Sequence, residues 1–269
     1  MGTDWSARFY VDDETSDQTI RAAFETLFHE IIAELSTWDD TSFISRLNKS
    51  APGIQFEAPP HFRAVWESAQ NVITRSEGAF FPFSATSESA ASETGCVMAD
   101  GFVQRPSGYV FDLSAIGKGY AVDQMGEVLR SRNINAFLVE IGGEFLASGL
   151  KPDGLPWWID LADPQNGPPV GRAAVFRHGL ATSGHQQNSE LTVEGFTSHI
   201  HGAEGAHLTE TVSVIASDCM SADAWATALI AAGDKGVALA EENEIAAIFY
   251  GGGGKSPRLT TRAEKWSQN

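Results

Sequence analysis

Several stretches of the chain place apolar residues at the spacing of an amphipathic helix. In the stretch 18–35, Ile20, Phe24, Leu27 and Ile31 recur every three or four residues and so share one helix face. Gly233 ends another such stretch, which Ser217 or Asp218 can cap. The pattern predicts helices at 18–35, 61–76, 219–232 and 235–242, a helical turn at 43–48, and a helix in the second half of 109–131.

Shorter apolar runs predict strands, and Gly, Pro and Ser clusters predict the loops between them. The run 136–141 is the clearest strand and ends at Gly142-Gly143. The expected strands are 5–11, 109–111, 136–141, a hairpin region containing Trp157-Trp158, 173–177, 190–196, 211–216 and 245–250, with loops at 84–100 and 163–171. Because strands and helices mix without strict alternation, we expect an α+β fold rather than a doubly wound sheet.

At 269 residues the chain has room for one large domain or two small ones. No internal repeat divides it, so we expect a single domain over 1–252. The four glycines that follow the last expected strand lead into a polar tail at 253–269.

The chain carries 18 Lys and Arg against 35 Asp and Glu, a formal net charge of −17. This charge argues against a nucleic-acid partner, because phosphate backbones bind cationic surfaces. A phosphorylated ligand would need a divalent cation between its phosphates and the acids of the protein. Solubility alone is the alternative account of the charge.

Cys96 and Cys219 lack metal-ligand spacing and are interpreted as thiols rather than a disulfide. No apolar run approaches the length of a membrane span. The N-terminus has neither the basic nor the apolar region of a leader. We therefore expect no membrane insertion and a cytoplasmic location.

One segment after the expected strand 109–111 indicates an anion site. It reads Asp112-Leu-Ser-Ala-Ile-Gly-Lys-Gly-Tyr-Ala-Val-Asp123 and turns through glycines into a helix. Such a turn brings Lys118, free backbone N–H groups and the positive end of a helix dipole together, which favours a phosphate.

A second segment adds oxygen ligands. Asp223 and Thr227 are four residues apart in the expected helix 219–232, so they share one face. A carboxylate and a hydroxyl presented together suit Mg²⁺ or Ca²⁺. On pattern alone, an ordinary acid near a helix start with a neutral threonine is the alternative.

Taken together, these segments resemble a known family. They are Asp112–Asp123, Leu138-Val-Glu-Ile-Gly-Gly-Glu144 and Ser221-Ala-Asp-Ala-Trp-Ala-Thr-Ala-Leu229. In this order they resemble the ApbE-type family, the FAD:protein FMN transferases. Weaker matches extend the resemblance over nearly the whole chain, at Met1–Ser6, Leu35–Asn48, Ala181–Gly184 and Thr197–Ile200.

The resemblance implies a fold and an activity. The fold would be a single ApbE-like domain, related to the T-fold, with a mixed and mainly antiparallel sheet and packed helices. The enzyme would bind FAD and Mg²⁺ (or Ca²⁺) and move the FMN half onto a Thr or Ser hydroxyl of an acceptor flavoprotein, releasing AMP. Its partners would be FAD and that acceptor.

The resemblance also implies site residues. The metal ligands would be the Gly117 carbonyl, the Asp223 carboxylate and Thr227, with Asp223 and His199 as the catalytic pair. A histidine titrates near neutral pH and can take the proton of an attacking hydroxyl. The residues expected to bind the flavin nucleotide are Met1, Trp38, Ala79, Phe80, Phe81, Ser114, Lys118, Tyr120, Glu140 and Ile200.

Several of these roles have structural alternatives. Lys118 can be a solvated lysine at a helix start, and Trp38 can cover the core instead of stacking on a ring of the ligand. A lone histidine in a strand, such as His199, is more often structural.

The chain also departs from the family pattern. Phe81 and Phe83 replace an Asp and a Thr, and His185 replaces another acid. An Asp-Pro pair is lost at Gly202-Ala203. These changes fall on the flavin and acceptor side, so hydrolysis of FAD to FMN and AMP and non-catalytic FAD binding are the alternative functions.

Overall fold

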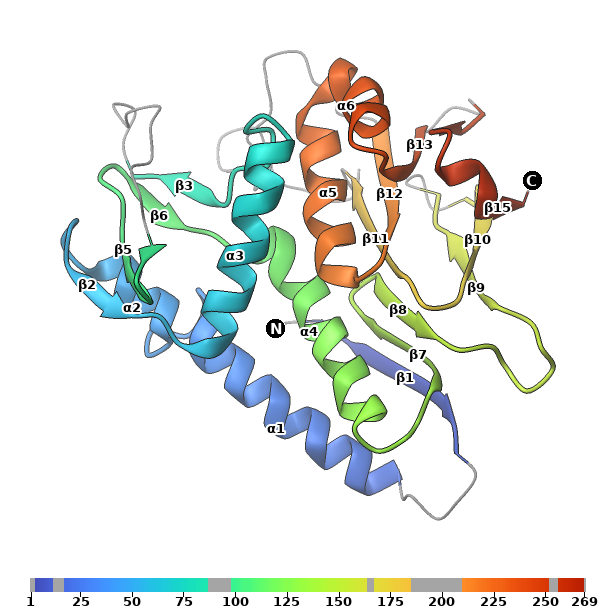
Figure 1. Cartoon of the computed structure of the whole chain (residues 1–269), viewed down its shortest axis with the longest axis horizontal. Coiled ribbons are helices and arrows are strands. Elements are labelled where there is room, and N and C mark those ends of the chain that lie inside the picture. The colour runs from blue at the N-terminus through green and yellow to red at the C-terminus, as the bar shows by residue number, and fades with distance from the viewer. Residues whose placement is uncertain are drawn as a thin grey trace.

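A seven-stranded antiparallel sheet forms the centre of the protein (Figure 1). The computed structural model describes residues 3–11, 17–86, 98–163, 167–184, 210–251 and 256–268. In the spatial order β1-β7-β8-β11-β12-β13-β14, the strands are β1 (Trp5–Tyr10), β7 (Ala136–Ile141), β8 (Glu144–Ser148), β11 (Gly179–Gly184), β12 (Glu210–Ala216), β13 (Ala246–Gly251) and β14 (Arg258–Leu259).

Helices cover one face of this sheet. Strand residues that face them, such as Phe137 and Val139, belong to the larger core, because alternate side chains of a strand point to opposite faces. The helices are α1 (Asp17–Leu35), α2 (Phe43–Lys49), α3 (Pro60–Arg75), α4 (Ser114–Arg130), α5 (Cys219–Ala231) and α6 (Gly236–Glu242), with short 3₁₀ turns at Gly233–Lys235 and Ala263–Lys265.

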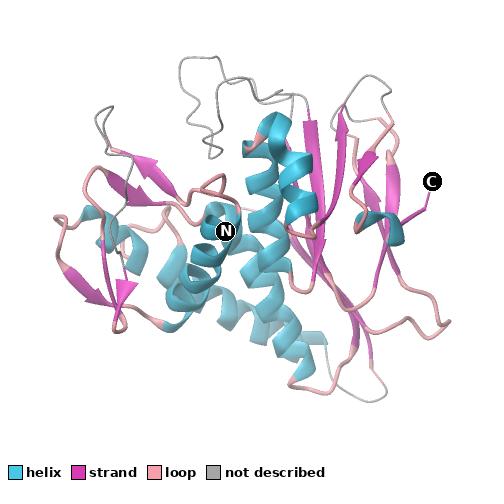
Figure 2. Ribbon diagram, turned by 45° about the horizontal axis from the view of Figure 1, so that its top comes forward, coloured by secondary structure: helices cyan, strands magenta, loops and turns pink. Residues whose placement is uncertain are grey.

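The other face is covered by a three-stranded sheet. Leu138, which alternates with Phe137 and Val139, packs there in a second core with Trp157. Its strands, in the order β15-β10-β9, are β9 (Trp157–Leu161), β10 (Gly171–Val175) and β15 (Ser267–Gln268). On the side of the helices that faces away from the large sheet lie two further small sheets, so the helices are enclosed between these and the large sheet (Figure 2).

Two small sheets complete the far side of the helices. They consist of β2 (Gln55–Glu57), β4 (Met98–Ala99) and β5 (Phe102–Gln104), and of β3 (Phe83–Ala85) and β6 (Tyr109–Phe111). The buried Phe83 ring contacts Trp66 and Phe111 at centroid distances of 5.5 and 5.0 Å. Phe81 lies 5.3 Å from Phe83. The aromatic replacements in the family pattern therefore pack against other rings.

The expected α+β class and the long helices are confirmed. The prediction of the helix start was wrong, because α4 begins at Ser114, before its glycines, so that Gly117, Lys118 and Gly119 lie inside the helix. The Gly117 N–H is already used and donates to the Leu113 carbonyl at 2.8 Å. The glycines therefore do not form a loop of free amides, and only Gly119 of the two has close neighbours beside its Cα.

Some strands were not predicted. β8 and β11 are short and contain small or polar residues, and β10 begins two residues before the predicted 173. The expected strand 190–196 lies outside the described residues. Residues 256–268 add β14 to the seven-stranded sheet and β15 to the sheet of β9 and β10, and they bury Thr260 and Ala263. Their few apolar positions gave no strand pattern.

A tight hairpin places the start of β8. Gly142 and Gly143 join β7 to β8 with φ of 58° and 96°, and two-residue turns with both φ values positive match the twist of the strands they join. The Gly143 N–H donates to Glu140 Oε1 at 2.9 Å. Glu144 is therefore held at the first position of a buried strand.

Helices α4 and α5 pack directly against each other. A Cβ at Gly119 would collide with the Cys219 carbonyl oxygen and lie 2.8 Å from Asp223 Cβ. One turn further along α4, the Asp123 carboxylate accepts the N–H groups of Cys219 and Met220, both at 2.8 Å. Burial raises the pKa of Asp123 to about 7, and these two N–H donors oppose that rise. The first turn of α5 is thus fixed to α4.

Among the residues that the structure describes, no helix combines the length and apolarity needed to cross a membrane.

We predict opposite effects for two glycines of α4. Gly119→Ala should destabilise the protein by about 1–3 kcal/mol, because the added methyl group meets the α5 backbone. Gly117→Ala is the matched control, since a Cβ there meets nothing within 4 Å. It should stabilise by about 0.5–1 kcal/mol through helix propensity. Urea unfolding measures both, and equal effects would contradict the close approach of the helices.

Candidate active site between α4 and α5

The Asp223 carboxylate lies at the centre of the candidate site. Its residue is 3% exposed, and its Oδ2 accepts the Gly119 N–H at 3.0 Å. Thr227 lies one turn along α5 and is also buried, with its Oγ1 3.1 Å from Ser183 Oγ of β11. The predicted shared face of Asp223 and Thr227 therefore points toward α4 and β11, where three oxygen-bearing side chains meet.

Lys118 and Glu144 form an ion pair beside these side chains. The Lys118 Nζ lies 2.7 Å from Oε1 of Glu144, whose side chain is almost fully buried. The other carboxylate oxygen of Glu144, Oε2, finds no hydrogen-bond partner among the described residues. A buried carboxylate oxygen without a partner is costly and indicates a position where a cation or donor is expected.

The charges of this group do not balance. Burial alone would lower the pKa of Lys118, but the Asp223 and Glu144 carboxylates outweigh it and raise that pKa. Burial raises the pKa of Asp223, against the effect of Lys118. Burial, followed by the charge of Asp223, raises the pKa of Glu144 to about 8. Two buried carboxyl groups thus share one ammonium, and a further cation would stabilise both in their ionised form.

Gly117 lies in the first turns of α4, next to Lys118. It is half-buried, with open space beside its Cα. Just before it, the exposed Ser114 begins the helix with its N–H donating to Asp112 Oδ1 at 3.1 Å. Gly117 and Ser114 therefore lie at the same end of α4 as Lys118.

The structure does not bring the other predicted nucleotide-binding residues into this cluster. Glu140 Oε2 accepts the Ser6 hydroxyl at 3.1 Å, on the face of the sheet away from the helices. The Tyr120 hydroxyl lies 2.7 Å from His61 Nδ1. Burial raises the pKa of Tyr120 to about 12. Because residues two apart on a helix point in nearly opposite directions, Tyr120 faces α3 rather than the ion pair.

The remaining candidates divide by exposure. Trp38 is 93% exposed, so it does not cover the core and its ring is available to a ligand. Phe80 is buried, whereas Ala79 and Phe81 are half-buried. Met1, His199 and Ile200 lie outside the described residues, as does His185.

Sequence reasoning singled out neither Glu144 nor Ser183 as site residues. Glu144 lies in a matched segment, and its place directly after the two-glycine turn was the available signal. Ser183 belongs to the Ala181–Gly184 match, but its contact with Thr227 depends on the pairing of β11 in the sheet. Such a contact across the fold leaves no trace in local periodicity.

The arrangement suits a hard cation bound by mixed oxygen ligands. No group of three or more His, Cys, Asp or Glu side chains in the described part of the chain could hold a metal ion. The candidate set needs only one carboxylate, supplemented by a carbonyl and a hydroxyl. Mg²⁺ is commonly held by one or two carboxylates together with substrate phosphates.

Comparison with known proteins gives a consistent family. A FAD:protein FMN transferase from Vibrio cholerae is 27% identical over 287 residues, covering 93% of this chain and 84% of the relative. One from Haemophilus influenzae is 29% identical over 289 residues, covering 91% and 83%. One from Escherichia coli is 34% identical over 134 residues, covering 48% and 38%.

Solved structures share the fold. The apo form of the Pseudomonas stutzeri flavinyl transferase ApbE superimposes with a TM-score of 0.82 at 23% identity, covering 100% of this chain and 95% of that chain. Flavin transferase ApbE from Vibrio cholerae gives 0.81 at 23% identity, covering 99% and 96%. Residues 1–95 and 84–249 also match the profile of the ApbE family. The chain therefore belongs to the ApbE family.

Proposed function

We propose that this protein transfers the FMN moiety of FAD to a Thr or Ser hydroxyl of an acceptor flavoprotein and releases AMP, with the help of Mg²⁺. Family membership and the names of the relatives support FAD as the substrate and a protein as the acceptor. The observation that carries the proposal is the buried Asp223 carboxylate, oriented by the Gly119 N–H beside Thr227 and Lys118.

The residues present fit a divalent cation. Within the described part of the chain, Glu144 Oε2 has no hydrogen-bond partner, and the buried carboxylates of the site outnumber its ammonium group. Both observations support missing positive charge. Asp223, Thr227 and the Gly117 carbonyl would hold the ion, and Ca²⁺ is the alternative to Mg²⁺. A bound Mg²⁺ would neutralise charge on the pyrophosphate and on the departing phosphate.

The protein's own residues position the reacting groups. Lys118 is paired with Glu144, but its side chain is 37% exposed and an ammonium has three donors. It can therefore hold a phosphate oxygen and keep its ion pair. Trp38 is our candidate for stacking on the flavin or the adenine, and its exposed ring supports that role.

The transfer balances as a phosphoryl substitution. The acceptor hydroxyl oxygen forms a bond to the phosphorus of the FMN half, and the bond from that phosphorus to the bridging oxygen breaks. AMP leaves with the bridging oxygen, and the hydroxyl proton passes to a base. His199 is our candidate for that base, on the strength of the family resemblance.

The alternative functions differ in what they release. Hydrolysis uses water in place of the hydroxyl and yields FMN and AMP without an acceptor. A non-catalytic member binds FAD and releases no AMP. The observation that favours these alternatives is the replacement of a polar Asp and Thr of the family pattern by Phe81 and Phe83, whose rings pack against other rings.

We predict that purified protein with FAD, Mg²⁺ and candidate flavoproteins gives a fluorescent acceptor band on a denaturing gel. Asp223→Asn should lower the rate by about 10²-fold or more, because it keeps the shape and an acceptor for Gly119 but removes the charge. Asp160→Asn, at an exposed acid paired with Arg172, is the matched control and should retain full activity.

Two results would count against this assignment. AMP release that needs no acceptor would identify hydrolysis as the activity. Unchanged turnover in Asp223→Asn would show that this carboxylate holds no essential metal.

We also predict pH-dependent stabilisation by Mg²⁺. The folded-state pKa of Glu144, about 8, lies above its ordinary 4.5. Its contribution to stability is therefore present below about pH 4.5 and lost as the pH rises toward 8. Mg²⁺ binds the ionised carboxylates, so its effect should grow over the same range.

Thermal unfolding at pH 6 and pH 8, with and without Mg²⁺, measures this effect. At a concentration tenfold above Kd, Mg²⁺ should add about 1.4 kcal/mol at pH 8, or about 3–5 °C in Tm, and clearly less at pH 6. An equal gain at both pH values, or the same gain in Asp223→Asn, would contradict the proposed ligands.

A further inference from the structure

Strand β1 has an unpaired edge among the described residues. It is the outermost strand of the large sheet and pairs only with β7. The Gly142 N–H donates to the Asp4 carbonyl at 3.2 Å, which makes Asp4 a hydrogen-bonded position of the ladder. Because such positions alternate, Ser6, Arg8 and Tyr10 bond to β7. The N–H and C=O groups of the residues between them point away from the sheet.

The hairpin confirms this alternation. Ile141 and Glu144 flank its two-residue turn and form the bonded pair that closes it, so Ile141 bonds to β8 and its two neighbours bond to β1. Trp5, Ala7 and Phe9 therefore direct their backbone groups to the open edge. Within the described residues, no backbone group forms a hydrogen bond with these N–H and C=O groups.

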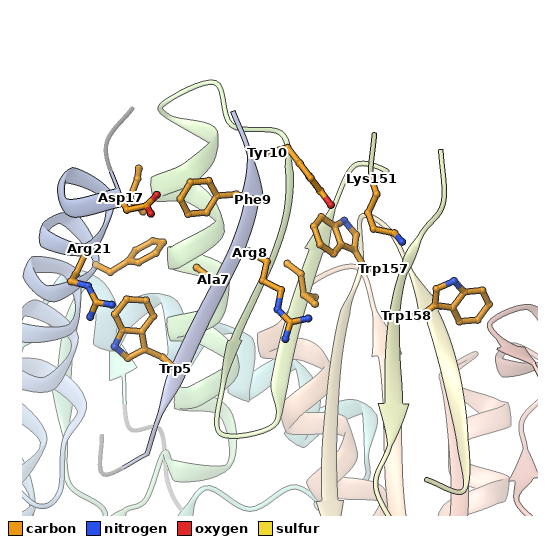
Figure 3. A pocket seen from close by; sticks show the side chains of 13 residues that line it. Trp5, Ala7, Arg8, Phe9, Tyr10, Asp17, Arg21, Lys151, Trp157 and Trp158 are labelled. Atoms are coloured by element: carbon orange, nitrogen blue, oxygen red, sulfur yellow. The ribbon is translucent and has the colours of Figure 1, made fainter. Parts of the chain in front are cut away.

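A groove of ≈ 630 Å³ surrounds this edge (Figure 3). On the helix side, Trp5 and Phe9 form its wall together with residues of α1. On the other side, the wall contains Arg8 and Tyr10, and the Tyr10 ring lies 5.8 Å from that of Trp157. The groove thus offers an apolar wall to one face of an added strand and a cationic, aromatic wall to the other.

The charge of the groove is opposite to that of the chain. Its lining contains Arg8, Arg21 and Lys151 against a single acid, Asp17, whereas the whole chain has 18 basic and 35 acidic residues. Arg21 lies over the Trp5 ring at 5.1 Å, and Lys151 has a 3.4 Å contact to Asp153. Arg8 is exposed and has no ion pair within the described ranges.

We propose that β1 binds an extended acidic segment of a partner protein as an additional strand of the sheet. Strand addition to an exposed edge uses main-chain hydrogen bonds for affinity and alternate side chains for specificity. The acidic side chains of the segment face Arg8 and Lys151, and its apolar side chains pack against Trp5 and Phe9. A second copy of this chain is the less suitable occupant, because two chains of charge −17 repel each other.

An alternating peptide tests this inference without reference to flavin transfer. The probe is the blocked heptapeptide Glu-Val-Glu-Val-Glu-Val-Glu, compared with its Lys-Val counterpart and with two versions N-methylated either at the Val or at the Glu residues. The Lys-Val peptide and the methylated version whose methyl groups point at β1 should not bind, because alternate N–H groups of an added strand face its neighbour. We expect the unmodified acidic peptide to bind, as seen in tryptophan fluorescence. It should slow amide hydrogen exchange at Trp5, Ala7 and Phe9 at least tenfold, and leave that of Ser6, Arg8 and Tyr10 nearly unchanged.

A charge reversal at Arg8 provides a second test of the proposal. Arg8→Glu, at an exposed side chain, should weaken binding of the acidic peptide by about tenfold. Arg262→Glu makes the same charge change at an exposed position outside the groove lining and should have no effect.

Several results would overturn the proposal. They are equal binding of the acidic and basic peptides, undiminished binding of both N-methylated versions, and unchanged exchange at Trp5, Ala7 and Phe9. Protection of these amides that rises with protein concentration, without peptide, would assign the edge to a second copy instead.

Discussion

A carboxylate buried between two helices is the constraint on which the site depends. Asp223 can be buried because Gly119 leaves no side chain between α4 and α5 and offers its N–H to the carboxylate. Lys118 then faces both Asp223 and Glu144. An ionised group in such surroundings is costly unless it is paired and hydrogen-bonded. The close contact of α4 and α5 is therefore needed for the charge arrangement of the site.

This arrangement also relates the acidity of the chain to the proposed chemistry. A protein of charge −17 repels a pyrophosphate unless cations are placed where it binds. Lys118 supplies one positive charge, but Glu144 and Asp223 together exceed it. A divalent cation bound in this group would reverse the sign of the local charge, so we expect metal and nucleotide to bind together.

The sequence was sufficient where local pattern decides the structure. Helical periodicity located α1, α3 and α5, and the spacing of Asp223 and Thr227 placed both on one buried face. Prediction from the sequence failed where tertiary contacts decide the structure. Glycines suggested a loop before α4, yet close packing against α5 explains Gly119. Ser183 and Glu144 reach the site through strand pairing and a hairpin, and strands as short and polar as β11 carry no clear period.

The most direct measurement of the central claim is the position of Mn²⁺, used in place of Mg²⁺, in a crystal of the protein with FAD. Anomalous scattering locates this ion independently of the protein density. The expected peak lies within about 2.0–2.3 Å of an Asp223 carboxylate oxygen, with Thr227 and the Gly117 carbonyl as further ligands. A nucleotide-bound structure with no peak at Asp223, or with the ion held by other residues, would contradict the proposed role of the buried carboxylate.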